Sequence, residues 1–465
     1  MPNHTTFENK TYDEINIGDE ATLTRVATEQ DFLVFANASG NLNSLHLSRY
    51  VQNGDGKRTA YAPPLWVASL VSAIFGNILP GVGARYRHQT FNFGARCIAG
   101  DVLDVKVKVT DKLADNVICF DTEIRRQSDN EVLISGPAEI YAPAKKLCFD
   151  ALKKPELMLE THPYFEELIR KAQKEAQVVT AVVAPEEEKS LGGAILAKQN
   201  GIITPILVGS EAKIRAVAKE NDWDLDGIEI INQVDHARAA NMAVDLIAEG
   251  RAGAMMKGHL HTDDLLRAAL RKVNGLRAGR RFTHVFVMDV PGVDHPILVT
   301  DAAINIQPDL KTKADIVQNA IDVAISIGIE VPKVGILSAV ETVNPDIPSS
   351  LDAALLSKMA DRGQITGGVV DGPLAMDNAV DLAAARTKGI TSEVAGHAEI
   401  LVVPNLDAGN MLAKQLAYIS HAEPAGLVLG ASVPIILNSR SDGDMARLAS
   451  CAIASLHHAR IGKKA

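Results

Sequence analysis

The sequence has few cysteines and few aromatic residues. Its four cysteines show no CxxC or other close spacing, which excludes a disulfide framework and predicts reduced, packed thiols: Cys97, Cys119, Cys148 and Cys451. Phe, Trp and Tyr make up 4% of the residues, too few for a surface on which nucleic-acid bases stack. A net charge of −10 also argues against nucleic acid as a partner.

An export signal and a long apolar run are likewise absent. The first twenty residues are polar and acidic, with neither a basic n-region nor an apolar h-region. No uninterrupted apolar run is long enough to span a bilayer. We therefore expect a cytoplasmic protein that acts on small molecules and contacts neither nucleic acid nor a membrane.

The N-terminal part has the residue pattern of an antiparallel sheet with one buried face and one solvent-exposed face. With 465 residues, 47% hydrophobic and 22% charged, the chain is typical of a soluble protein with several cores. From residue 101, DVLDVKVKVTDKL alternates Val and Lys, and two similar segments follow with a turn at 129–130, which predicts an antiparallel meander. The stretch 65–78 is apolar nearly all round, so we expect a helix buried against this sheet.

From about residue 176, short apolar runs alternate with helical stretches such as 315–327. This pattern predicts a parallel sheet covered on both faces, with strands in VVTAVVAP, ITPILVG, GAMMKG, THVFVMDV, KVGILSA, AEILVV and VPIILN. Between these two regions, the segment 141–160 contains two prolines and four lysines. We expect a first domain at 1–145, a linker at 146–158, and a second domain at 159–465 that opens with a helix over 162–175.

The segment 265–288 contains no acidic residue, although the whole chain is acidic. It holds six basic residues, which are Arg267, Arg271, Lys272, Arg277, Arg280 and Arg281. Such a cluster favours an anionic ligand, because guanidinium groups bind phosphate through two hydrogen bonds. The alternative is that Arg267 pairs with Asp263 while the others coat a solvated face.

The residues before this basic segment form a strand-to-helix turn. Lys257 and Gly258 end a predicted strand, and Thr262 is placed to cap a helix that begins at Asp263. His259 and His261 lie in the turn, but two histidines without a third ligand nearby do not make a metal site. We predict no metal.

A second strand-to-helix connection lies near the C-terminus. An apolar strand at 433–437 leads into NSRSDGD (438–444) and then into a helix. Free N–H groups at a helix start, together with a serine and Arg440, suit a phosphate-like group. An ordinary capped connection would also contain Ser and Asp, although it would not need the arginine.

Residues 160–465 resemble the phosphate acetyltransferase and phosphate butyryltransferase family. Six ordered blocks carry the resemblance: ITPILVGS (203–210), MKGHLHTDDLLRAAL (256–270), LVTDAAINIQPDL (298–310), GVVDGPLAMDNAV (368–380), PNLDAGN (404–410) and NSRSDGD. The resemblance implies reversible acyl transfer between CoA and phosphate, with CoA as substrate and no tightly bound cofactor. It also implies a two-lobed α/β fold like that of isocitrate and isopropylmalate dehydrogenases, with lobes at 159–300 plus 436–465 and at 301–435.

The same resemblance implies roles for individual residues. Ser439 and Arg440 match the pair that holds the acyl phosphate, and Asp444 matches the aspartate that takes the CoA thiol proton, with Asp442 as a rival. Arg267 matches an arginine that meets phosphate. The other matching substrate-binding positions are Lys257, Thr262, Asn305, Gly409 and Asn410.

The N-terminal domain resembles the MaoC-like R-specific enoyl-CoA hydratases, which have a hot-dog fold: a meander wrapped round a central helix. The family signature S-G-D-x-N-P-x-H reads SGNLNSLH at 39–46, which keeps His46 but puts Asn41 at the catalytic aspartate. Pro64 stands where the family has a glycine N–H for the thioester oxygen, and proline has no N–H. The N–H of Leu65 would be the substitute for the missing glycine N–H. His46 acting alone would be the substitute for the missing aspartate base.

These departures predict weak or absent hydration, because a general base and an oxyanion donor each contribute roughly 10²-fold or more. We expect the domain to bind acyl-CoA or to build the homo-oligomer that both resemblances imply. The alternatives are a bifunctional hydratase and acyltransferase, or a non-catalytic acyl-CoA-binding module. An NAD-dependent dehydrogenase lacks support, since no GxGxxG follows a strand.

Overall fold

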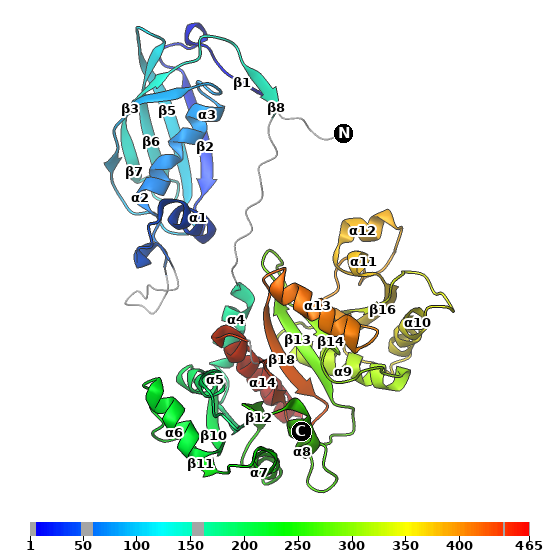
Figure 1. The fold of residues 1–465 in the computed structure, drawn as a ribbon. Helices are drawn as coiled ribbons and strands as arrows, with labels where there is room; N and C mark the ends of the chain where they lie inside the picture. The colour runs from blue at the N-terminus through cyan, green and yellow to red at the C-terminus, as the bar shows by residue number, and fades with distance from the viewer. Residues whose placement is uncertain (1–5, 48–58, 151–161, 440–441, 465) are drawn as a thin grey trace. The chain divides into compact units, whose positions relative to one another are not determined.

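The computed structural model describes residues 6–47, 59–150, 162–439 and 442–464. The chain divides into two compact units, residues 1–157 and 158–465 (Figure 1). Each unit has its own hydrophobic core, and each is described by itself below.

The first unit is an antiparallel sheet in the order β2-β5-β6-β7-β3, with β4 also paired to β7. The strands are β2 (Glu20–Val26), β3 (Arg85–Gln89), β4 (Asn92–Phe93), β5 (Val102–Leu113), β6 (Val117–Arg126) and β7 (Val132–Tyr141). Alternate residues of β5, such as Val105 and Val107, are fully buried while Lys106 and Lys108 are exposed. The predicted meander is therefore confirmed, and Asn130 in its second turn has a left-handed φ of 60°.

Two short helices pack against the buried face of this sheet. The predicted helix over 65–78 is split at Leu70 into α2 (Pro64–Ser69) and α3 (Val71–Asn77). The ring of Phe75 on α3 meets the ring of Phe120 on β6 edge-on, 5.0 Å between centroids. A meander around a central helical segment is the hot-dog architecture that the sequence predicted. The longer helix α1 (Glu29–Ser39) begins at a capping box formed by Thr28 and Asp31.

The first unit extends beyond its predicted end at residue 145. The strand β8 (Cys148–Asp150) pairs antiparallel with β1 (Thr6–Glu8). Residues 148–150 therefore belong to the first unit and not to a linker, because their backbone groups are hydrogen-bonded to its N-terminal strand.

The second unit contains one eleven-stranded sheet in the order β11-β10-β9-β12-β19-β18-β13-β14-β17-β15-β16. The strands are β9 (Val178–Val183), β10 (Ile203–Gly209), β11 (Glu229–Asn232), β12 (Ala254–Lys257), β13 (Thr283–Asp289), β14 (Ile297–Thr300), β15 (Lys333–Leu337), β16 (Val369–Leu374), β17 (Ile400–Val402), β18 (Glu423–Leu429) and β19 (Ile435–Ile436). Each of the seven predicted apolar runs contains a strand. The strands β11, β14, β16 and β18 were not predicted.

The sheet is mixed, so the prediction of a parallel sheet is wrong at its centre. The strand β13 is antiparallel to both β14 and β18, and β18 is antiparallel to β19. The segment 290–296 joins β13 to β14, and the segment 430–434 joins β18 to β19. Connections this short cannot cross over a sheet face, because a parallel crossover needs a dozen or more residues.

Helices cover both faces of this sheet, as predicted. On β9, Val182 lies in the core cluster that contains α5 and α14, whereas Ala181 and Val183 lie in the cluster that contains α7 and α8. The helices are α4 (Pro163–Ala172), α5 (Glu188–Gln199), α6 (Glu211–Glu220), α7 (His236–Ala248), α8 (Thr262–Ala269), α9 (Leu310–Ser326), α10 (Pro348–Asp361), α11 (Met376–Val380), α12 (Leu382–Thr387), α13 (Leu406–Tyr418) and α14 (Asp444–Lys464).

Two predicted helices have different bounds in the structure. The helix predicted over 315–327 is α9, which begins at Leu310 because the Asp309 side chain accepts a hydrogen bond from the Thr312 N–H at 2.8 Å. The helix predicted over 162–175 is the shorter α4. Within the described ranges, none of the helices is both long enough and apolar enough to cross a membrane.

Candidate active site

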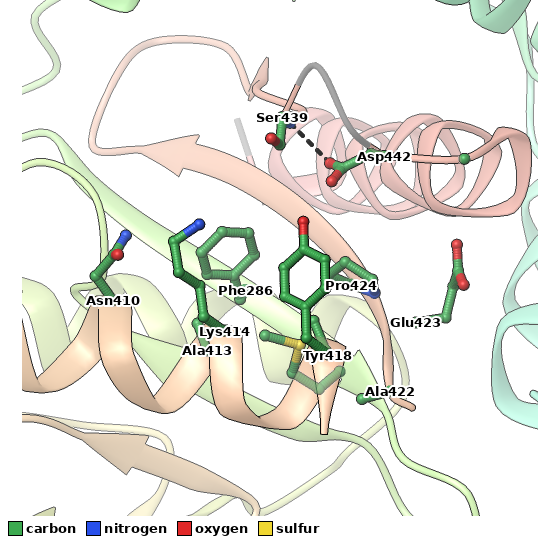
Figure 2. A pocket seen from close by; sticks show the side chains of 13 residues that line it. Phe286, Asn410, Ala413, Lys414, Tyr418, Ala422, Glu423, Pro424, Ser439 and Asp442 are labelled. Atoms are coloured by element: carbon green, nitrogen blue, oxygen red, sulfur yellow. Dashed lines mark hydrogen bonds between the residues drawn. The ribbon is translucent and has the colours of Figure 1, made fainter. Parts of the chain in front are cut away.

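A cavity of about 200 Å³ lies in the second unit between α13 and the segment that leads into α14 (Figure 2). One side is apolar and comes from β13, α13 and the start of β18. The other side is polar and comes from Ser439, Asp442 and Gly443. The lining residues are Phe286, Met288, Asn410, Ala413, Lys414, Ala417, Tyr418, Ala422, Glu423, Pro424, Ser439, Asp442 and Gly443.

The polar side is organised by Asp442. Its Oδ2 accepts hydrogen bonds from the Ser439 N–H at 2.7 Å and from the Asn438 side chain at 3.3 Å. Burial raises the pKa of the Asp442 carboxyl, and these hydrogen bonds only partly oppose that effect. Figure 2 shows the Ser439 and Asp442 side chains above the cavity. Arg440 lies outside the described residues, and Asp444 is exposed at the start of α14 and does not line the cavity.

A buried arginine on α14, Arg447, contacts the main chain at Ser439, and no sequence motif predicted this role. The Arg447 side chain on α14 is 3% exposed, and its Nη2 donates a hydrogen bond to the Ser439 carbonyl at 2.9 Å. Burial lowers the pKa of Arg447, although Asp442 and Glu187 nearby oppose this. Gly193 on α5 leaves the space, since a Cβ there would lie 2.9 Å from Arg447 Cδ. No motif marks Arg447, because it acts through a tertiary contact.

The opposite side of the cavity is formed by α13. Asn405 caps this helix by accepting a hydrogen bond from the Ala408 N–H at 3.0 Å. Asn410 lines the cavity, and its Nδ2 donates to the Ala302 carbonyl at 3.3 Å. Lys414 lies one helical turn later and also lines the cavity, but it falls outside the PNLDAGN block from which Asn410 was predicted.

Gly409 and Asn305 have structural contacts instead of lining the cavity. A Cβ on Gly409 would lie 2.7 Å from the Asp301 carbonyl oxygen, so this glycine lets α13 approach the turn after β14. The Asn305 Nδ2 donates to Asp301 Oδ2 at 2.6 Å and to the Phe282 carbonyl at 2.9 Å. Its amide N–H groups are therefore used within the protein.

Lys257, Thr262 and Arg267 do not line this cavity. Lys257 ends β12 with 7% exposure, and its Nζ donates to the Gly258 carbonyl at 3.4 Å. The prediction that Thr262 caps a helix beginning at Asp263 is wrong, because α8 includes Thr262 and follows His261 without a side-chain cap. Arg267 pairs with Asp264 at 3.0 Å and not with Asp263.

The arginines of the basic segment disperse to different partners. Arg271 forms an ion pair with Asp245 on α7, and Arg280 pairs with Asp322 on α9 at 2.7 Å. The Arg277 Nε donates to the Leu270 carbonyl at 3.0 Å. The acidic partners that the segment itself lacks are supplied by other helices, so these side chains do not gather in one anion site.

His259, in the turn after β12, and His236, at the start of α7, each lie beside a glutamate. His259 Nδ1 lies 2.8 Å from Glu187 Oε2, and the neighbouring His236 Nε2 lies 3.2 Å from Glu186 Oε2. In the part of the chain that the structure describes, no group of three His, Cys, Asp or Glu side chains is placed to hold a metal ion.

In the first unit, the structure places His46, Asn41 and Pro64, the three residues singled out in the N-terminal domain, in different surroundings. The His46 ring is 9% exposed, and its Nδ1 lies 2.9 Å from the Tyr61 carbonyl, which can only accept. Because a carbonyl oxygen accepts only, Nδ1 is the donor in this contact. The Asn41 side chain accepts from the Asn43 N–H at 3.2 Å. Pro64 is the first residue of α2, so Leu65 carries the first N–H of that helix.

Comparison with known proteins found the following similarities. The family described as "Phosphate acetyl/butaryl transferase" matches residues 164–243 and 233–455. A phosphate acetyltransferase of Rhizobium meliloti is 59% identical over 296 residues, which cover 64% of this chain and 94% of that protein. A branched-chain phosphotransacylase of Enterococcus faecalis V583 has 30% identity and a TM-score of 0.53, covering 61% of this chain and 99% of that one. An R-hydratase of Pseudomonas aeruginosa has 30% identity and a TM-score of 0.32, covering 33% and 99%.

Proposed function

The chain belongs to the phosphate acetyl/butyryl transferase family, and we propose that it transfers a short acyl group reversibly between CoA and phosphate. In the acetyl case, acetyl-CoA and phosphate give acetyl phosphate and CoA. The observation that carries the proposal is the cavity in which Ser439 and Asp442 face Asn410 and Lys414 (Figure 2). The family blocks NSRSDGD and PNLDAGN thus supply opposite sides of one site.

The chemistry of these side chains fits thioester formation. A CoA thiol is mostly protonated at neutral pH, so a carboxylate within reach must take its proton as attack begins. The new S–C bond forms at the carbonyl of the acyl phosphate, and the C–O bond to phosphate then breaks. The proton held by the carboxylate passes to the departing phosphate, which returns the site to its starting state.

We assign the proton acceptor to Asp442 in preference to Asp444. Asp442 lines the cavity and has a raised pKa, whereas Asp444 is exposed outside it. A raised pKa makes the carboxylate a stronger base, which suits transfer from a thiol. Ser439, Lys414 and the predicted Arg440 are placed in this proposal as the groups that stabilise the phosphate and the oxyanion of the tetrahedral intermediate.

Several wider features of the proposal come from the family. We propose two lobes like those of isocitrate and isopropylmalate dehydrogenases, at 159–300 plus 436–465 and at 301–435. CoA is a substrate in this scheme, and no tightly bound cofactor takes part. A cytoplasmic location and a homo-oligomeric state complete the proposal.

For the first unit, we propose a hydratase-like domain that binds acyl-CoA and has lost most of its hydratase rate. The missing carboxylate at Asn41 and the missing N–H at Pro64 support this. A residual hydratase is the second candidate, and the observation that favours it is the buried His46, whose ring is held through Nδ1 by the Tyr61 carbonyl so that Nε2 is not used in that contact.

The proposal is tested by mixing the protein with acetyl or butyryl phosphate and CoA and following the disappearance of the thiol. We expect turnover, and Arg440→Ala should remove most of it, by about 10²-fold or more. Asn41→Ala, in the other unit, is the matched control and should leave the rate close to that of the unaltered protein. Absence of turnover with either acyl phosphate would contradict the proposed function.

A further inference from the structure

The apolar side of the cavity is built from small residues at positions where larger ones would fill it. Ala413 and Ala417 are four residues apart on α13, so they present neighbouring methyl groups on one face of the helix. Ala422, just before β18, adds a third methyl group to the lining. Phe286 and Met288 of β13 complete the apolar lining, and Figure 2 shows the ring of Phe286 above Ala413 of α13.

The size of the cavity exceeds what an acetyl group requires. A methyl group is close in size to a water molecule, whose share of liquid volume is about 30 Å³. The cavity measures about 200 Å³ and opens beside Ser439 and Asp442. An acetyl group reacting there would leave most of this apolar space without an occupant, whereas two further methylene groups would extend along it.

We propose that this apolar wall receives the hydrocarbon part of a four-carbon acyl group, with Ala417 as the residue that sets the permitted chain length. The inference rests on the proposed function, because it places the reacting carbonyl near Ser439 and Asp442. The chain of a butyryl group carries no polar atom beyond its carbonyl, so it buries against Phe286, Met288 and the alanines without leaving any hydrogen bond unmade.

The pantetheine arm of CoA is the competing occupant. It carries two amide groups, and amides buried against apolar side chains without partners lose free energy. The lining at Phe286, Met288, Ala413 and Ala417 offers no side-chain donor or acceptor beyond the thioether sulfur of Met288. The polar lining at Asn410, Lys414 and Glu423 suits such an arm better, which leaves the apolar wall for the acyl chain.

The first experiment uses the full-length protein and compares kcat/KM for acetyl, propionyl and butyryl phosphate at saturating CoA. Burial of each added methylene group is expected to raise kcat/KM by about fourfold, so that butyryl phosphate, with two more methylene groups, exceeds acetyl phosphate by about fifteenfold. An acetyl value equal to or above the butyryl value would overturn the inference and leave the proposed function standing. Absence of turnover with all three would overturn both.

The second experiment reduces the space beside the apolar wall with Ala417→Leu and uses Met411→Leu as its control. Met411 lies on the same helix, is 69% exposed and does not line the cavity. Ala417→Leu should lower the butyryl-to-acetyl ratio of kcat/KM by about tenfold or more, and Met411→Leu should leave that ratio unchanged. An Ala417→Leu protein whose KM for CoA rises equally with every acyl phosphate would overturn the inference in favour of pantetheine.

Discussion

Arg447 donates a hydrogen bond from its buried guanidinium to the main-chain carbonyl of Ser439, at 2.9 Å. The donor lies on α14, and the acceptor lies in the segment that forms the polar side of the cavity. Because the Arg447 side chain is only 3% exposed, it has little freedom to move. The position of Ser439 is therefore coupled to the packing of α14 against α5, where Gly193 leaves the necessary space.

Replacing Arg447 with methionine should impair the site more than the fold. The substitution keeps an apolar side chain of similar length but leaves the Ser439 carbonyl without this donor. We expect kcat/KM to fall by about 10²-fold, as for a small misplacement of reacting groups, and the free energy of unfolding to fall by about 1–3 kcal/mol. Steady-state kinetics and urea unfolding measure the two effects. Arg447→Lys, which restores a charged donor, should recover part of kcat/KM, and unchanged kinetics in Arg447→Met would contradict the coupling.

Asp442→Asn and Asp444→Asn distinguish the two candidates for the base. An asparagine at 442 still accepts the hydrogen bond from the Ser439 N–H but cannot take a proton. We expect Asp442→Asn to lower kcat by about 10²- to 10⁴-fold, and Asp444→Asn to change it by less than about tenfold. Should Asp444→Asn prove the more damaging of the two, the assignment to Asp442 is wrong.

The pH profile gives an independent readout of Asp442. Only the ionised carboxylate accepts a proton, so activity should fall as the pH falls through the pKa of Asp442. Since burial raises that pKa above its usual value of 3.8, the acid limb should lie at a higher pH than for an exposed aspartate. The positive charge of Arg447 lowers the same pKa, so the residual activity of Arg447→Met should show an acid limb displaced to still higher pH.

The sequence predicted the elements of the second unit better than their directions. Strands buried on both faces are continuous apolar runs whether they are parallel or antiparallel, so the run at β13 did not reveal its orientation. The information lay in the seven residues of 290–296, which are too few for a crossover. The strand β18 was missed because EPAGLVL begins with a charge, a proline and a glycine, which are not typical of a central strand.

The sequence predicted only those residues of the candidate site that lie within a family motif. Ser439 and Asn410 lie in family blocks and line the cavity, whereas Lys414, Tyr418 and Glu423 line it without any motif. Asn305 also lies in a family block, but its amide is used to hold the Asp301 turn. A sequence lists which residues are polar, and only the tertiary contacts decide which of them face a cavity.

The basic segment shows the same limit for charge. Its arginines were interpreted from a window of 24 residues that contains no acid, 265–288. In the structure, Asp245 and Asp322 lie beside Arg271 and Arg280, although both acids are distant in the sequence. Ion pairs form between neighbours in space, so a local count of charge overstates the positive potential.

His284 should make stability depend on pH. The residue is fully buried in β13, its ring lies 4.3 Å from that of Phe286, and burial lowers its pKa from 6.5 to about 4. Between these values the unfolded chain binds a proton that the folded chain does not, so acid favours unfolding. We expect the free energy of unfolding to fall by about 2 kcal/mol between pH 6.5 and 5, at about 1.4 kcal/mol per pH unit.

Urea unfolding at a series of pH values measures this effect, and His284→Leu isolates it. The variant has no imidazole to protonate, so its free energy of unfolding should change less over the same pH range. His295→Leu is the control, because His295 is a partly exposed histidine paired with Asp294. Equal pH dependence in His284→Leu and the unaltered protein would contradict the role of His284.

A gain-of-function experiment tests the proposal that the first unit has lost most of its hydratase rate. Crotonyl-CoA hydration, followed by loss of the enoyl absorbance, should be slower than in active R-specific hydratases by about 10²-fold or more, because two elements of the site are missing. Asn41→Asp restores the carboxylate and should raise the rate, and adding Pro64→Gly restores a backbone N–H at the start of α2 and should raise it further. His46→Ala in the doubly altered protein should abolish the gain, since the proposed site uses His46 as its other base. A rate in the unaltered protein close to that of active hydratases, and lost in His46→Ala, would instead establish a bifunctional enzyme.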